Sequence, residues 1–237
     1  MAATDIRKTV LQIVNESREK FALDTVSTLY ADKESKLMTE LLNDVIDEVS
    51  DYGDWKEMLR TEILVTASSS VFDYTIETSA LVKNIHEIAF DNDISPMWLT
   101  TVDDILRLNR SGGFSRPRQW SIIGVDDYAN PRVRVFPTPG TNENNKTFKI
   151  TYYKKPRLYS YSVTADANAV PEFPAKPLIA GLIAVKCLEE SGGAPTQQYA
   201  AYRNEFEKKL KESYNRFNAD TGSNSYFTPS FGRSRYR

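Results

Sequence analysis

The residues best suited to catalysis are one histidine, His86, and one cysteine, Cys187. Together a thiol and an imidazole could form a nucleophile and its base. Cys187, however, lies in an apolar segment, and reactive thiols need an electropositive, accessible setting. We therefore expect Cys187 to be a buried thiol that packs as a small hydrophobe.

Other common catalytic and cofactor signatures are missing from the sequence. A single histidine excludes zinc or haem sites that need two imidazoles. Neither G-x-x-x-x-G-K-[ST] nor G-x-G-x-x-G occurs, so the usual phosphate-binding loops are lacking. We predict that the protein is not an enzyme and holds no metal or organic cofactor.

Acidic residues recur along one predicted helix and the turn after it: Glu40, Asp44, Asp47, Asp51 and Asp54. Carboxylates three and four residues apart share one side of a helix and could hold a divalent cation. The alternative is a solvated outer face, the ordinary place for charges on an amphipathic helix.

Basic and aromatic residues occur together at the end of the last predicted strand and just after it. Lys154, Lys155 and Arg157 lie beside four tyrosines: Tyr152, Tyr153, Tyr159 and Tyr161. Such a mixture could bind single-stranded nucleic acid, because bases stack on rings while cations contact phosphates. The alternative is an ordinary strand end whose tyrosines lie at a subunit interface.

A second basic and aromatic segment ends the chain, after Asn218. This segment contains three arginines and one acid, Asp220, so its side chains carry a net charge of plus two. A segment without a core of its own orders only on a partner, and aromatic and Arg residues often anchor interfaces. We interpret residues 219–237 as an extended docking tail rather than a merely disordered end. Its partner-binding residues are Tyr226, Phe227, Phe231, Arg233, Arg235, Tyr236 and Arg237.

The composition is that of a globular protein, with 237 residues, 41% of them hydrophobic. A chain of this length can bury one core or a closely joined pair. Because 30 Lys and Arg nearly balance 32 Asp and Glu, a global attraction to nucleic acid or anionic membrane is not indicated. No apolar run approaches the roughly 18 residues of a membrane span. We expect a soluble protein that is made in a reducing cytosol and is not exported by the usual route.

Hydrophobic periodicity predicts helices at both ends of the chain. Residues 4–23 form the first, with Thr4 or Asp5 as N-cap, and residues 37–52 the second. Residues 178–188 form a helix whose one charge is Lys186, so other layers or other subunits must cover it. Residues 191–193 end this helix. The apolar stripe of the last helix is Tyr199, Tyr202, Phe206, Leu210 and Phe217.

Alternating apolar and polar residues predict a sheet module between these helices. The strands are 61–67, 71–77, 82–90, 119–125, 132–136 and 146–154, with a short helix at 101–109. The fold class is therefore α+β: a helical bundle formed by the N- and C-terminal helices, with an inserted antiparallel β module and an extended C-terminal tail. The predicted domains are 1–60 for the N-terminal helices, 61–160 for the β-rich module with its short helix, 161–218 for a linker and the C-terminal helices, and 219–237 for the tail.

The order of four segments and a helix is informative. "WSIIG", "VRVFPTPG", "FKITYYKKPRLY" and "PLIAGLIAVKCLEESGG" are followed by a helix of "YAAYRNEFEKKLKE" type. This order resembles the head-to-tail adaptor proteins of tailed bacteriophages, also called connector or neck ring proteins. The resemblance covers roughly the second half of the chain.

The resemblance implies a structural virion protein that forms a ring below the portal, joins the capsid portal to the tail and continues the DNA channel. It implies a homo-oligomer, a dodecamer that matches the portal, with portal protein and tail or nozzle proteins as partners. Genomic DNA would pass without sequence-specific contact, and no membrane is involved. The location would be the virion neck, after assembly in the host cytoplasm.

Further expectations follow from the resemblance. Helices would surround the channel, the β module would project toward the periphery or the tail, and the C-terminal extension would reach the portal. An acidic lining would repel phosphate, which gives the acidic helix face a third interpretation. We also expect the apolar face of residues 178–188 and the tyrosine-rich strands to become buried between subunits only when the ring forms. The main alternative function is a nucleic-acid-binding accessory protein that uses the Tyr/Lys surface near residues 152–157. A different tail or neck ring component also stays open, and a hydrolase is the weakest alternative because a nucleophile and base are lacking.

Overall fold

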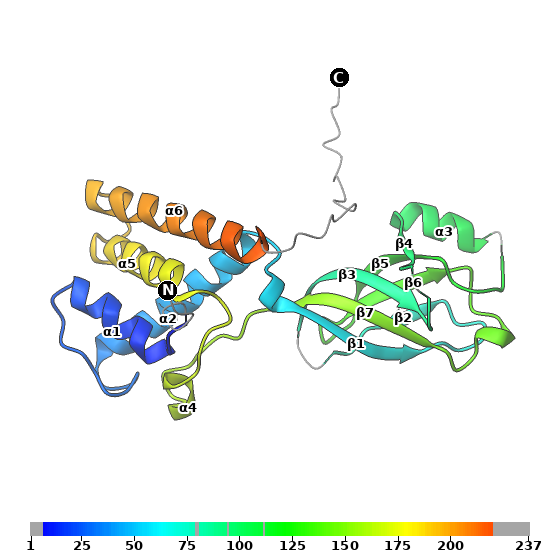
Figure 1. The fold of residues 1–237 in the computed structure, drawn as a ribbon, viewed down its shortest axis with the longest axis horizontal. Helices are drawn as coiled ribbons and strands as arrows, with labels where there is room; N and C mark the ends of the chain where they lie inside the picture. The colour runs from blue at the N-terminus through cyan, green and yellow to red at the C-terminus, as the bar shows by residue number, and fades with distance from the viewer. Residues whose placement is uncertain (1–6, 79–80, 94, 111, 220–237) are drawn as a thin grey trace, which may run out of the picture.

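The chain forms a helical lobe and a β lobe that lie side by side and are joined at a narrow junction (Figure 1). The structure is a computed structural model and describes residues 7–78, 81–93, 95–110 and 112–219. The helical lobe contains α1 (Val10–Lys20), α2 (Lys33–Asp51), α4 (Thr164–Ala167), α5 (Ala175–Glu190) and α6 (Gln197–Ala219). The fold is therefore α+β, with chain segments from both ends in the helical lobe.

The first helix begins later than the sequence analysis predicted. Its N-cap is Thr9, whose hydroxyl accepts from the Gln12 backbone N–H at 3.2 Å, while the Gln12 side chain accepts from the Thr9 N–H at 2.9 Å. This capping box satisfies two backbone donors at once, so it fixes the helix start. The predicted caps, Thr4 and Asp5, lie outside the described residues.

The apolar helix α5 lies inside the subunit, where it packs against α1, α2 and α6. Gly181 allows this close packing, because a Cβ there would lie 2.5 Å from Val45 Cγ1 and 3.0 Å from Phe206. The expectation that an apolar face of residues 178–188 waits for another subunit is wrong. Three neighbouring helices already cover it.

The end of α5 was predicted correctly at residues 191–193. The N–H of Gly192 donates to Glu189 O and that of Gly193 to Leu188 O, both at 2.9 Å. The two glycines have φ of 67° and 82°, which side chains with a Cβ rarely adopt. This pair of bonds is the Schellman motif, and it turns the chain from α5 toward α6.

The β lobe consists of two sheets. The first has the order β1 (Leu59–Thr66), β7 (Thr147–Lys154), β3 (Val82–Phe90), and its strands are antiparallel. The second has the order β2 (Asp73–Thr75), β6 (Pro131–Phe136), β5 (Gln119–Val125), β4 (Trp98–Leu99), with β4 parallel to β5. Helix α3 (Val102–Arg110) contacts β5 and β6, and short 3-10 turns occupy Lys56–Met58 and Thr141–Glu143.

The facing sides of the two sheets form a core separate from that of the helices. Val133 and Val135 face Phe148 and Ile150, and all four are buried, as the alternation in the sequence predicts. Strands 61–67 and 71–77 were predicted around a serine-rich turn, but β1 and β2 lie in different sheets. The turn instead carries the chain from one sheet to the other, and β2 has only three residues.

A few specific contacts connect the two lobes. The ammonium group of Lys83 on β3 donates to Gly53 O at 3.1 Å and also to Ser50 O, at the C-terminal end of α2. The segment after β7 then crosses α2, where Asn43 exchanges two hydrogen bonds of 2.8 and 2.9 Å with the backbone of Tyr159. These bonds hold the segment after β7 on the helical lobe. They therefore fix the direction in which the chain passes from β7 into that lobe.

Candidate assembly surfaces

The structure places the one cysteine and the one histidine in different lobes. Cys187 is buried in α5, as expected for a thiol that packs as a small hydrophobe. His86 is exposed on β3, where its ring lies 5.7 Å from that of Tyr153. These positions do not form a nucleophile–base pair.

The acidic residues form one exposed strip along α2 and just beyond its C-terminal end. All five carboxylate residues of this acidic strip are exposed: Glu40, Asp44, Asp47, Asp51 and Asp54. Within the described part of the chain, no ion pair involves them, and no group of three or more His, Cys, Asp or Glu side chains could hold a metal ion. The strip thus presents uncompensated negative charge to whatever lies beside α2.

The structure leaves little of the Tyr/Lys surface near residues 152–157 open for stacking bases. Tyr152 is fully buried and its hydroxyl donates to Glu62 Oε1 at 2.7 Å. Tyr159 is also buried, and this burial raises the pKa of its phenol to about 12. Lys154 pairs with Glu172 at 2.6 Å, and Arg157 pairs with Asp166. Tyr153 and Tyr161 are partly buried against the helical core. Two buried and two partly buried rings disfavour the nucleic-acid-binding alternative.

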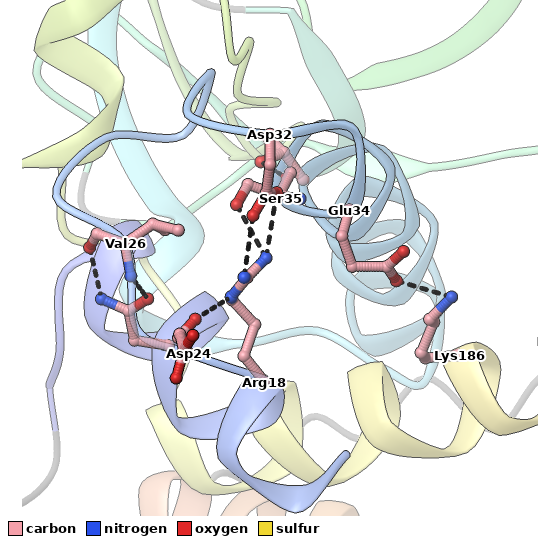
Figure 2. A network of polar contacts seen from close by, with 9 residues as sticks. Arg18, Asp24, Val26, Asp32, Glu34, Ser35 and Lys186 are labelled. Atoms are coloured by element: carbon pink, nitrogen blue, oxygen red, sulfur yellow. Dashed lines mark hydrogen bonds and ion pairs between the residues drawn. The ribbon is translucent and has the colours of Figure 1, made fainter. Parts of the chain in front are cut away.

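A polar network that sequence reasoning missed fixes α1 against the start of α2 (Figure 2). The Arg18 guanidinium is almost fully buried and donates to both carboxylate oxygens of Asp32, at 2.8 and 3.0 Å. Asp32 is also the N-cap of α2 and accepts from Ser35 N–H at 2.6 Å. The Ser35 N–H and the Arg18 guanidinium together lower the pKa of Asp32 to about 2. An Asp that precedes an amphipathic helix is the sequence signal for the cap, but nothing local indicates Arg18.

The lowered pKa predicts a pH dependence of stability. The pKa of Asp32 falls from 3.8 to about 2 on folding. The ionised Asp32 therefore adds to the free energy of unfolding above pH 4, and this contribution is lost as pH falls through 2. Asp32→Asn should therefore lower the free energy of unfolding by about 1 kcal/mol at pH 7, a value discounted for solvent screening. Urea unfolding should show the difference shrinking toward pH 2. Asp24→Asn is the control, because Arg18 uses the backbone oxygen of Asp24; an equal pH-dependent loss there would contradict the assignment.

The predicted docking residues, from Tyr226 to Arg237, lie outside the described residues. The structure does show where their segment begins. Helix α6 ends at Ala219, and Asn218 lies at the junction of the lobes, donating to Asp54 O at 3.3 Å and accepting from Lys56 Nζ at 2.9 Å. The described chain therefore ends beside the C-terminal end of α2.

Large apolar side chains are exposed on the β lobe, and sequence reasoning did not select them. Trp98 and Phe114 are 70% and 68% exposed. In the described part of the chain, no helix combines the length and apolar character that crossing a membrane requires. Exposed aromatic residues on such a body are candidates for contacts with other proteins.

A family model described as the SU10 adaptor protein matches residues 1–230. The chain belongs to the SU10 adaptor protein family. This is a family of phage head-to-tail adaptors, so the resemblance drawn from the second half of the sequence is confirmed and extends over both lobes. None of the curated proteins matches the chain significantly.

Membership in the SU10 adaptor family gives the protein a structural role in a phage particle. It implies a location at the head–tail junction, contacts with portal and tail, and association with further copies. The assembly contacts must then come from surfaces that the subunit leaves open, since α5 and Tyr152 are already buried.

Proposed function

We propose that the protein forms a dodecameric ring below the portal, joins the portal to the tail or nozzle proteins, and continues the DNA channel in the virion neck. Assembly takes place in the host cytoplasm. The family match over residues 1–230 is the observation that carries this proposal. In a ring of identical copies each contact joins two different surfaces of the chain, and the open surfaces of the two lobes meet that requirement.

The four segments predicted from the sequence have distinct roles in this proposal. Residues 1–60 and 161–218 supply a helical bundle that surrounds the channel, and residues 61–160 project as the β module. Residues 219–237 reach the portal, with the aromatic and Arg residues from Tyr226 to Arg237 as anchors. The last described residues support this role, because Asn218 lies at the lobe junction beside Asp54 and Lys56.

The experiment that tests the proposal is sedimentation of the full chain with purified portal protein. A large complex of defined mass should form, while the protein alone sediments as a monomer or a weakly associated species. Persistent monomer in the mixture, at concentrations well above micromolar, would overturn the proposal.

The acidic strip on α2 is the surface that faces the DNA in this proposal. Its carboxylates are exposed and have no ion-pair partner among the described residues, so they would repel phosphates within about one Debye length, roughly 8 Å at physiological salt. Repulsion keeps the genome from adhering to the wall during exit.

Neutralising the strip should therefore slow genome release. The variant changes Glu40 to Gln and the four aspartates to Asn, and the measurement is the rate of DNA ejection from purified particles. We expect a slower rate at low salt, converging on the wild-type rate at high salt, with unchanged ring assembly. The control replaces Glu205, Glu207 and Glu212 of α6 by Gln. Equal ejection rates for the strip variant and wild type would show that the strip faces away from DNA.

A further inference from the structure

The far end of the β lobe displays an apolar surface that no other part of the described chain covers. We define this distal surface by Trp98, Leu99, Val102, Phe114 and Arg118. The side chains of Trp98, Leu99, Val102 and Phe114 are 70%, 58%, 40% and 68% exposed. Tryptophan is usually well buried, so a largely exposed one beside further apolar side chains indicates an interaction site.

The backbone beneath these side chains is held from several directions. Trp98 N–H donates to Arg118 O at 2.8 Å, while the preceding Met97 N–H donates to Ile88 O on the opposite side at 2.7 Å. Phe114 is held in the same way, because Thr138 donates to Gly113 O and accepts from Ser115 N–H, both at 3.0 Å. The exposed rings thus sit on a fixed frame, which lowers the entropy cost of binding.

Hollows lie on both sides of the segment 114–118. One, of about 480 Å³, is lined by Trp98, Pro96, Pro117 and Arg118 among others. The other, of about 370 Å³, lies between Phe114 and the segment 140–143. Two hollows separated by a strip of backbone suit an extended chain better than a small rounded ligand.

The charge left open in the larger hollow is positive. Asp93, in the larger hollow, is neutralised by Arg116, whose guanidinium donates to both carboxylate oxygens at 2.6 and 2.9 Å. Arg118, which also lines this hollow, is exposed and forms no ion pair with any residue that the structure describes.

The distal surface also lies away from the point where the tail begins. Helix α3 and strand β4 lie on the side of the β lobe remote from the helical lobe, whereas α6 ends at the junction (Figure 1). If the tail holds the portal, as in the proposed function, the far end of the β lobe is free for a different protein.

We propose that the distal surface binds an acidic, extended segment of the virion protein on the tail side of the ring. Apolar side chains of that segment pack on Trp98 and Phe114, and a carboxylate pairs with Arg118. This inference rests on the proposed function, because it assigns the tail-side contact of the same adaptor.

Site-specific crosslinking in assembled particles tests the occupant. The photoreactive residue p-benzoylphenylalanine replaces Leu99 in one variant and Tyr128 in the control. Tyr128 is 82% exposed in the turn after β5, held by Asp126 rather than by the distal loops. Irradiated particles with Leu99 replaced should yield a crosslink to an acidic segment of a virion protein other than the portal and the adaptor. A crosslink to the portal or to a second adaptor copy, or no crosslink beyond the control's, would overturn the proposal.

Substitutions test the contribution of the named side chains. Trp98→Ala and Arg118→Glu should each weaken the tail-side contact about 30-fold, as expected for an interface hot spot. In an infection where the variant is the only adaptor supplied, the weaker contact should yield DNA-filled heads that carry the adaptor but lack a tail. Tyr128→Ala should give normal particles. If wild-type protein fails to join the portal, the proposed function fails; if it joins and both variants acquire tails normally, only the distal-surface assignment fails.

Discussion

Truncation after Asn218 is expected to abolish binding to the portal while the melting temperature stays that of the full chain. We expect the helical core to fold without the tail, because the last buried core members among the described residues are Phe206 and Leu210. Four rings buried on a partner would contribute about 6–12 kcal/mol, which at about 1–2 kcal/mol per residue offsets the ordering of only about six residues. We therefore expect only the segments around the rings to dock, and a tail without its rings should not bind the portal. Thermal melting and co-sedimentation with portal measure the two effects.

Two full-length variants separate the apolar from the ionic part of this contact. Replacing Tyr226, Phe227, Phe231 and Tyr236 by Ser should reproduce the truncation. Replacing Arg233, Arg235 and Arg237 by Gln should weaken portal binding in a salt-dependent way, because charge pairs at an interface are screened. Undiminished portal binding by the truncated protein would move the contact to the helices.

Lys186→Met is expected to cost about 3 kcal/mol of folding free energy, the range for breaking a buried ion pair. The Lys186 ammonium is nearly fully buried and lies 2.6 Å from Glu34 Oε1 (Figure 2). It also lies 2.8 Å from Glu189 Oε2. Burial opposes its charge, but the carboxylates of Glu189 and Glu34 outweigh this and raise its pKa. Methionine would fill the space and leave Glu34 without its cation.

The double variant Lys186→Met with Glu34→Met separates loss of packing from an unpaired charge. It should recover most of the lost stability in urea unfolding at pH 7, since an apolar pair can replace a buried ion pair at little cost. Lys176→Met is the matched control, because Lys176 is exposed on the same helix, and its effect should stay within about 0.5 kcal/mol. If Lys186→Met melts like wild type, this ion cluster does not fix α5 against α2.

The sequence alone determined features that depend on near neighbours in the chain. The alternation of Val133 and Val135 with arginines predicted β6 and its buried face, and the two glycines after Ser191 predicted the end of α5. A side-chain period and a cap require only the few residues around them. The order of such segments was also enough to indicate the adaptor family.

Tertiary structure decided which of these segments meet. Periodicity showed that α5 must be covered but could not tell a neighbouring helix from a neighbouring subunit, and the structure supplies α1, α2 and α6. Periodicity likewise could not show that the hydroxyl of Tyr152 reaches Glu62, 90 residues away. The sequence analysis therefore placed the tyrosines at a surface. Arg18 was missed for the same reason, since its partner Asp32 lies 14 residues along the chain. Burial and ion pairing are set by contacts between distant segments, and the chain's local pattern does not record which distant segments those are.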